Sequence, residues 1–161
     1  TSLLLIGWGI GAPLAGWLSD RLKRRKPLMV LGALVALTTF SAVVYTPGLS
    51  LEAARVLLFI NGVFSGSMVL CFAAAREHNR PETAGATLGF VNTFVMAAGA
   101  IFQPLIGWLL DLGWDGALAA GVRIYSVSTY RAAFLTIVVS GTVCLLMGLL
   151  MRETHCKNTT E

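Results

Sequence analysis

The feature that most constrains the fold is a series of five apolar segments, each close to the roughly 20 residues that a membrane-spanning helix needs. Polar stretches separate the segments, and only 12% of the 161 residues are charged, about half the fraction of a soluble domain. The pattern predicts an all-α integral membrane protein with one spanning helix per segment. The segments run near 2–19, 27–46, 55–75, 85–110 and 130–151, with a polar tail at 152–161.

Positive charge assigns the two sides of the membrane. Loop 20–26 alone holds five Lys or Arg residues, and alternation of the segments puts nine on its side against three on the other. Because the basic side is the cytoplasmic side, we expect loop 20–26 and the C-terminal tail in the cytoplasm, with the chain in a bacterial inner (plasma) membrane. A nucleic-acid patch is disfavoured because apolar segments flank the loop on both sides.

The chain begins with Thr, and its first segment lacks the basic start and small-residue cleavage site of a signal peptide. We therefore expect a piece that begins inside a longer protein.

A spaced motif ends the first segment: Gly16, Asp20, Arg21, Arg24 and Arg25 in the order G-x-x-x-D-R-x-x-R-R. It resembles the loop signature of the major facilitator superfamily, G-x-x-x-D-[RK]-x-G-R-[RK]. Lys23 stands where the family prefers Gly. The resemblance implies membrane transport by alternating access. It also implies a cytoplasmic latch of Asp20 with Arg21 and Arg24, which holds one state and breaks in the other. A solvated charge cluster is the alternative, since surface ion pairs are weak.

The chain also repeats itself. Residues 10–20 read IGAPLAGWLSD and residues 101–111 read IFQPLIGWLLD, identical at seven of eleven positions. The charge count makes the two copies run in opposite directions, which is the property of an inverted-topology repeat. The superfamily is similar in having inverted three-helix units, with equivalent helices three apart.

Five helices after such a loop correspond either to helices 8–12 or to helices 2–6 of that family. Lys23 in the signature and the ending Arg152-Glu153-Thr154 favour helices 8–12. We therefore interpret residues 1–161 as a partial six-helix C-terminal half. Its expected partners are membrane lipid, a small-molecule solute and the N-terminal half of the same transporter.

The fourth segment has two unlike faces. Asn92 and Gln103 share one with Gly99 and Gly107, and the large apolar Phe90 and Phe94 lie opposite. We expect the Phe side against lipid and the polar side at a central cavity, with Asn92 contacting solute and Gln103 nearer the outer mouth. Pro104 is expected to kink the helix, and Gly99 and Gly107 are expected to let another helix approach.

The third segment places Asn61 and Ser65 on one face. They are candidate solute-binding residues, with hydrogen bonding between helices as the alternative. Thr38, Thr39 and Ser41 are expected to bond back to their own helix.

No nucleophile–base pair, phosphate loop or metal-ligand cluster is found in the sequence, so we expect no enzyme, no metal and no cofactor. The sequence favours a secondary transporter, a symporter or antiporter for a small polar solute. The alternative is a non-transport membrane protein, such as a receptor, anchor or assembly factor, that kept the fold.

Overall fold

Helices form all five predicted spans in the computed structural model, which describes residues 2–119 and 121–159. The all-α prediction with five helices long and apolar enough to cross a membrane is confirmed. The elements in chain order are α1 (Ser2–Leu22), α2 (Lys26–Tyr45), α3 (Leu51–Ser65), the 3-10 helix η1 (Gly66–Val69), α4 (Leu70–Glu77), the 3-10 turn η2 (Pro81–Thr83), α5 (Ala84–Leu112), the strands β1 (Leu118–Ala119) and β2 (Val122–Arg123), and α6 (Val127–Leu150). α3, η1 and α4 together make the third span.

Two helices begin earlier than their apolar segments do, because polar side chains cap them. The Ser50 hydroxyl accepts the N–H of Ala53 at 3.2 Å and starts α3, and the Ser126 hydroxyl accepts the N–H of Thr129 at 3.2 Å and starts α6. Serine at this position satisfies one of the N–H groups that a helix start leaves free. Hydropathy alone misses these polar first turns.

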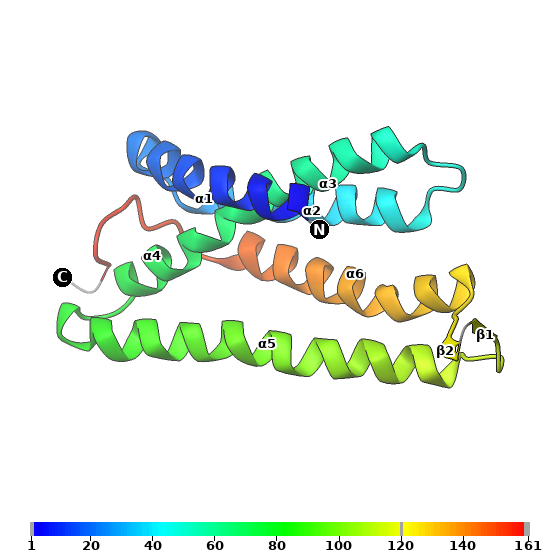
Figure 1. Cartoon of the computed structure of the whole chain (residues 1–161). Coiled ribbons are helices and arrows are strands. Elements are labelled where there is room, and N and C mark those ends of the chain that lie inside the picture. Colours follow the sequence, from blue (N-terminus) through cyan, green and yellow to red (C-terminus); the bar gives the residue numbers. More distant parts are fainter. Residues whose placement is uncertain (1, 120, 160–161) are drawn as a thin grey trace.

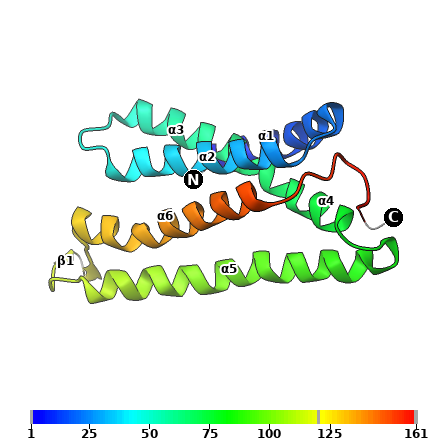
Figure 2. The same cartoon turned by 180° about the vertical axis from the view of Figure 1, so that it is seen from behind.

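The helices form a stack in which chain neighbours do not always touch. α1 packs on α3, α3 on α2, α2 on α6, and α5 on α4 and α6. Figure 1 and Figure 2 show α1–α3 along one side of the molecule, α6 in the middle and α5 along the other side. Loop 20–26, the α4–α5 turn and the C-terminal tail lie at one end, which we call the basic end; the α2–α3 loop and the β1–β2 hairpin lie at the opposite end.

Two pairs of glycines set the distance between α1 and α3. A Cβ atom on Gly11 would lie 1.9 Å from the carbonyl oxygen of Val63, and one on Gly62 would lie 2.1 Å from that of Leu4. Gly7 and Gly66 are equally blocked by backbone of the other helix. The spacing Gly-x-x-x-Gly in both partners lets the two backbones touch.

Two hydrogen bonds join α2 to α6 near the end opposite the basic end. The Tyr45 hydroxyl donates to the carbonyl oxygen of Arg131 at 2.8 Å, and Arg131 Nε donates to that of Val44 at 3.1 Å. One turn inward, the rings of Phe40 and Phe134 meet edge to face at 6.0 Å.

α5 runs opposite to α1 (Figures 1 and 2), as the repeat of residues 10–20 and 101–111 requires. The two-fold axis that would relate the copies stays a prediction. α5 continues through Pro104 to Leu112 as one helix.

Candidate functional site

Arg25 is the centre of a polar network at the basic end. It follows the turn between α1 and α2, and its side chain is only 9% exposed. The guanidinium donates from NH2 to Glu77 Oε1 at 2.8 Å, from NH1 to Asp20 Oδ1 at 2.6 Å, and from NH1 to the Ser19 hydroxyl at 3.0 Å. One cation thus joins the ends of α1, α2 and α4.

Glu77, the last residue of α4, carries the network to the C-terminal tail. Its carboxylate accepts hydrogen bonds from Arg25 and from the hydroxyl of Thr154, and both of these partners are buried. The Glu77 carbonyl oxygen accepts the backbone N–H of Thr159 at 2.9 Å. The tail therefore crosses the basic end and is fixed there rather than extending into solvent.

Glu153 caps α2 from a distance of 128 residues in sequence. Its carboxylate accepts the backbone N–H groups of Arg25 at 2.8 Å and Lys26 at 3.1 Å, the first groups of α2. No local side chain caps this helix. A carboxylate at a helix N-terminus is stabilised both by these bonds and by the helix dipole.

The network fixes the ionisation of its members. Burial alone would lower the pKa of Arg25, but its hydrogen bonds to Glu77 and Asp20 outweigh burial and raise that pKa, so the cation is permanent. Burial alone would raise the pKa of Glu153, but backbone N–H donors, led by that of Arg25, outweigh it and hold the pKa below its ordinary value of 4.5.

The latch residues of the signature occupy different positions in this network. Asp20 is paired with Arg25, although its own side chain is 68% exposed. Arg21 stacks on Trp17, with 5.3 Å between the guanidinium carbon and the ring centroid. Arg24 is exposed, and Gly16 has open space where a Cβ would lie. Arg25, rather than Arg24, is thus the partner of Asp20.

The candidate Asn61 is turned towards α2. It is 7% exposed, and its amide nitrogen donates to the Ala36 carbonyl oxygen at 2.7 Å and to the Thr39 hydroxyl at 2.9 Å. Thr39 in turn bonds back to Val35, as expected. These contacts support the alternative reading of Asn61 as a link between helices. Ser65 and Asn61 both line a cavity of about 240 Å³ between α2, α3 and α6.

Asn92 and Gln103 are exposed on α5. A Cβ built on Gly99 or Gly107 meets no atom of residues 2–119 and 121–159 within 4 Å, so the expected close packing finds no partner in this part of the chain. The structure does not bring Asn61 and Asn92 to one site. They lie on different helices, with Asn61 buried against α2.

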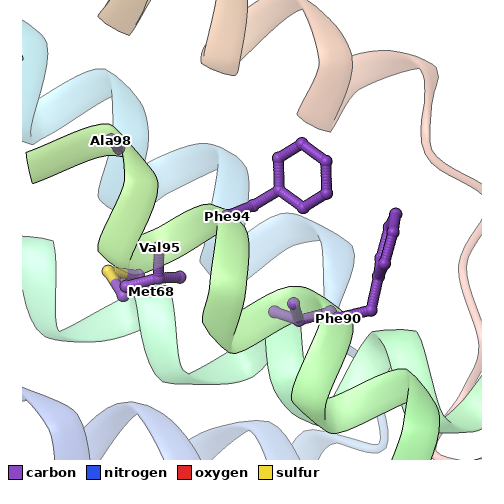
Figure 3. Close-up of a pocket in the computed structure, with 6 residues that line it drawn as sticks. Met68, Phe90, Phe94, Val95 and Ala98 are labelled. Carbon is purple, nitrogen blue, oxygen red and sulfur yellow. The ribbon is translucent and has the colours of Figure 1, made fainter. Parts of the chain in front are cut away.

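The Phe side of α5 faces an open apolar groove of about 480 Å³ (Figure 3). Met68 of η1 lies beside Val95, while the rings of Phe90 and Phe94, 4.8 Å apart, project from neighbouring turns of α5. All the lining side chains are apolar. A polar solute finds no hydrogen-bond partner in this groove, so the polar face of α5 remains the candidate for solute contact.

The far end of α5 carries a second charged cluster. Asp111, the counterpart of Asp20 in the repeat, accepts from Arg123 at 2.7 Å and from the Tyr125 hydroxyl at 2.6 Å. Arg123 also lies 4.5 Å above the ring of Trp114. The bond to Asp111 raises the pKa of Tyr125. Each aspartate of the repeat thus pairs with an arginine, and the two pairs lie at opposite ends of the molecule.

Sequence reasoning missed Ser19, Glu77, Glu153 and Thr154 as network members. Glu77 follows a long apolar segment and is 52 residues from Arg25, so no spacing rule links the two. The available signal was the charge itself, because Glu77 ends a spanning segment on the same side as five basic residues.

Within the described residues, no group of three or more His, Cys, Asp or Glu residues is placed to hold a metal ion. Cys71, Cys144 and Cys156 are free thiols.

Fold and site together define a multi-span membrane protein whose helices are joined at one end by a buried charge network. The family model for the Major Facilitator Superfamily matches residues 1–160, so the chain belongs to that superfamily of membrane transporters. Its transporters are not enzymes, as expected from the sequence. The chain is also 33% identical over 130 residues to the membrane sensor protein UhpC of Salmonella typhimurium. This match covers 75% of the chain and 29% of UhpC, so the chain spans well under two thirds of that relative.

Proposed function

We propose that this chain is part of a secondary transporter that moves a small polar solute by alternating access, as a symporter or antiporter of the plasma membrane. The observation that carries the proposal is the Arg25 network in a chain of this superfamily. The network ties four segments together through hydrogen bonds that can break and re-form. A device of this kind is suited to biasing an equilibrium between two states.

In this proposal the chain forms helices 8–12, and an N-terminal half completes the transporter. Lys23 at the glycine position of the signature supports this assignment over helices 2–6. Because a facilitator's cavity lies between its two halves, the chain alone does not transport. Loop 20–26 and the tail face the cytoplasm, as the nine-to-three distribution of positive residues favours.

Solute contact is assigned to the polar face of α5, with Asn92 at the solute and Gln103 nearer the outer mouth. Their separation of eleven residues corresponds to about 16 Å along the helix. Exposed amides in a spanning helix need hydrogen-bond partners, and a polar solute supplies them. Asn61 is assigned to packing, because both of its donated bonds go to α2.

Counterflow in proteoliposomes tests the proposal. The full-length protein is reconstituted with a panel of small polar solutes, and we expect exchange of at least one of them. Asn92→Ala should raise the KM for that solute or abolish exchange while the protein stays folded. The matched control is Thr93→Ala, because the Thr93 hydroxyl donates to the Gly89 carbonyl of its own helix. Equal kinetics for both variants and wild type would remove Asn92 from the solute site.

A second candidate, a membrane sensor, is favoured by the similarity to UhpC. A sensor binds its solute but does not carry it across. Saturable solute binding without any counterflow in the same preparation would select this alternative.

The latch is tested by Asp20→Asn in the full-length protein. We expect transport to fall much more than membrane abundance does, because the change removes one of two carboxylates from Arg25 and alters the balance of states. Asp115→Asn at the opposite end is the control. Transport within about twofold of wild type, at equal abundance, would return Asp20 to the role of a solvated charge, since exposed pairs contribute at most about 1 kcal/mol.

A further inference from the structure

Loop 20–26 presents more positive charge than its own acids neutralise. Arg25 forms ion pairs with both Asp20 and Glu77. No other carboxylate of the described residues lies within 4.0 Å of the charged groups of Arg21, Lys23 or Arg24, and all three of these residues are exposed. Three cations therefore extend from the basic end without an acidic partner in this part of the chain.

Trp17 shows where these cations sit relative to the membrane. It shares an exposed stripe of α1 with Leu3, Ile6, Ile10 and Leu14, which lies beside the glycines that pack on α3. Such a stripe of large apolar side chains is suited to contact with lipid. Trp17 lies at its basic end, where tryptophan prefers the boundary between hydrocarbon and headgroups, and Arg21 lies above its ring.

The turn that carries the other two cations is fixed by backbone hydrogen bonding. The N–H of Arg24 bonds the carbonyl of Ser19 at 3.2 Å, and the Ser19 hydroxyl donates to the carbonyl of Arg24 at 2.9 Å. Lys23 takes a left-handed conformation with φ of 56°. The positions of Lys23 and Arg24 relative to Arg21 are therefore set by the fold.

We propose that Trp17, Arg21, Lys23 and Arg24 form a binding site for the phosphate of an anionic phospholipid. The arginine fork matches the geometry of phosphate oxygens, and Trp17 contacts the upper part of the acyl chains. Asp20, the nearest acid, has its charge engaged by Arg25. The site requires only that α1 spans a membrane, so it stands independently of transport.

The test is native mass spectrometry of the full-length protein titrated with phosphatidylglycerol or phosphatidylcholine. We expect wild type to prefer phosphatidylglycerol. Because it removes the three cations proposed to contact the phosphate directly, Arg21→Gln/Lys23→Gln/Arg24→Gln should weaken phosphatidylglycerol binding by about 100-fold. It should weaken phosphatidylcholine binding much less, because the choline cation of that lipid offsets its phosphate charge. The matched control is Arg76→Gln/Arg80→Gln/Arg152→Gln, which removes three other exposed cations from the same end.

Two results separate a site from a general surface charge. The proposal expects the control triple variant to bind phosphatidylglycerol with an affinity within about threefold of wild type. Equal losses of affinity in the two triple variants would mean that the lipid responds to the overall surface charge and would overturn the proposal. Inorganic phosphate should not compete, because the site also holds acyl chains; full competition would mean a soluble anion site and overturn it as well.

A second measurement needs no charge variant. Lipids brominated on their acyl chains quench nearby tryptophan fluorescence, and the difference between wild type and Trp17→Phe isolates the signal of Trp17. Brominated phosphatidylglycerol should quench this signal more than brominated phosphatidylcholine does. Equal quenching by the two lipids would overturn the proposal.

Discussion

At the scale of single residues, Lys23 explains why the family's signature has a glycine at its position. Lys23 is the first residue beyond α1 and has a φ of 56°. The N–H of Arg24 reaches back to the carbonyl of Ser19 and closes the helix end. Glycine is the usual residue at this left-handed position, because it has no Cβ to collide with the following carbonyl.

Lys23→Gly should therefore raise the free energy of unfolding by about 1 kcal/mol, since the left-handed conformation costs a side-chain-bearing residue roughly 1–2 kcal/mol. Thermal unfolding of the purified full-length protein measures the change. Arg24→Gly is the control, because Arg24 is not left-handed and gains nothing from glycine. A lower melting temperature for Lys23→Gly than for wild type would contradict this account.

The sequence identified the residues of the signature but not their partners. Asp20 lies at the negative end of its helix dipole, where a carboxylate needs a cationic partner, and the structure supplies one. The cation is Arg25, five residues on, rather than Arg24, because the left-handed residue turns the chain before α2 begins. Which of two adjacent arginines becomes buried depends on that turn, and helical spacing does not describe it.

At the scale of elements, α1 and α3 are held together by opposed glycine pairs. Gly7 and Gly11 face Gly62 and Gly66, and any Cβ at these positions would overlap backbone atoms of the other helix. Gly9 lies on another side of α1 and meets nothing within 4 Å among the described residues. Gly9 and Gly11 are about half a turn apart on α1 and thus differ in role: Gly11 allows the contact with α3, and Gly9 takes no part in it.

Gly11→Ala and Gly9→Ala should change stability in opposite directions. Gly11→Ala forces α1 and α3 apart and should cost about 1–3 kcal/mol or more, as overpacking does. Gly9→Ala should stabilise by up to about 1 kcal/mol, through the higher helix propensity of alanine. Melting temperatures of the two full-length variants compare them directly. Equal tolerance of both changes would show that the backbones are not in contact.

Hydropathy located the five candidate spans of the described residues, yet it does not describe what happens inside the third span. The third span changes to a 3-10 helix at Gly66–Val69, where a Cβ on Gly66 would overlap the backbone of Gly11 and Ala12. Hydropathy likewise gave no sign of Asn61 as a link to α2. An amide on a helix face predicts a hydrogen bond but not the helix that accepts it.

At the scale of the whole molecule, the C-terminal tail closes the basic end. Glu153 binds the start of α2, Thr154 binds Glu77 at the end of α4, and the thiol of Cys156 lies 3.6 Å from the carbonyl oxygen of Ser19 at the end of α1. Burial raises the pKa of Cys156 and keeps it as a thiol. Three spans are joined by a segment of four residues.

The stability given by Glu153 should depend on pH. Its folded-state pKa lies below the ordinary value of 4.5, so its contribution is present above pH 4.5 and is lost as the pH falls through the folded-state pKa. At neutral pH, Glu153→Gln should cost about 1 kcal/mol, the worth of a charge at a helix start. The measurement is the difference in unfolding free energy between wild type and this variant, followed from pH 7 down to acid.

That difference should be constant from neutral pH to about pH 5.5 and should shrink at lower pH. Arg152→Gln, next in sequence but exposed, is the control and should show no such trend. A gap that widens in acid would mean that Glu153 is bound as a neutral acid.

The cap on α2 also has a consequence for the order of events during synthesis. Glu153 leaves the ribosome 128 residues after Arg25, which corresponds to roughly ten seconds at ordinary elongation rates. During that interval α2 is already made, but its first N–H groups lack Glu153, whereas Glu77 follows Arg25 after only 52 residues. The nascent chain therefore passes through a period in which the start of α2 lacks its cap and is open to insertion factors and proteases, and synthesis of the segment around Glu153 ends that period.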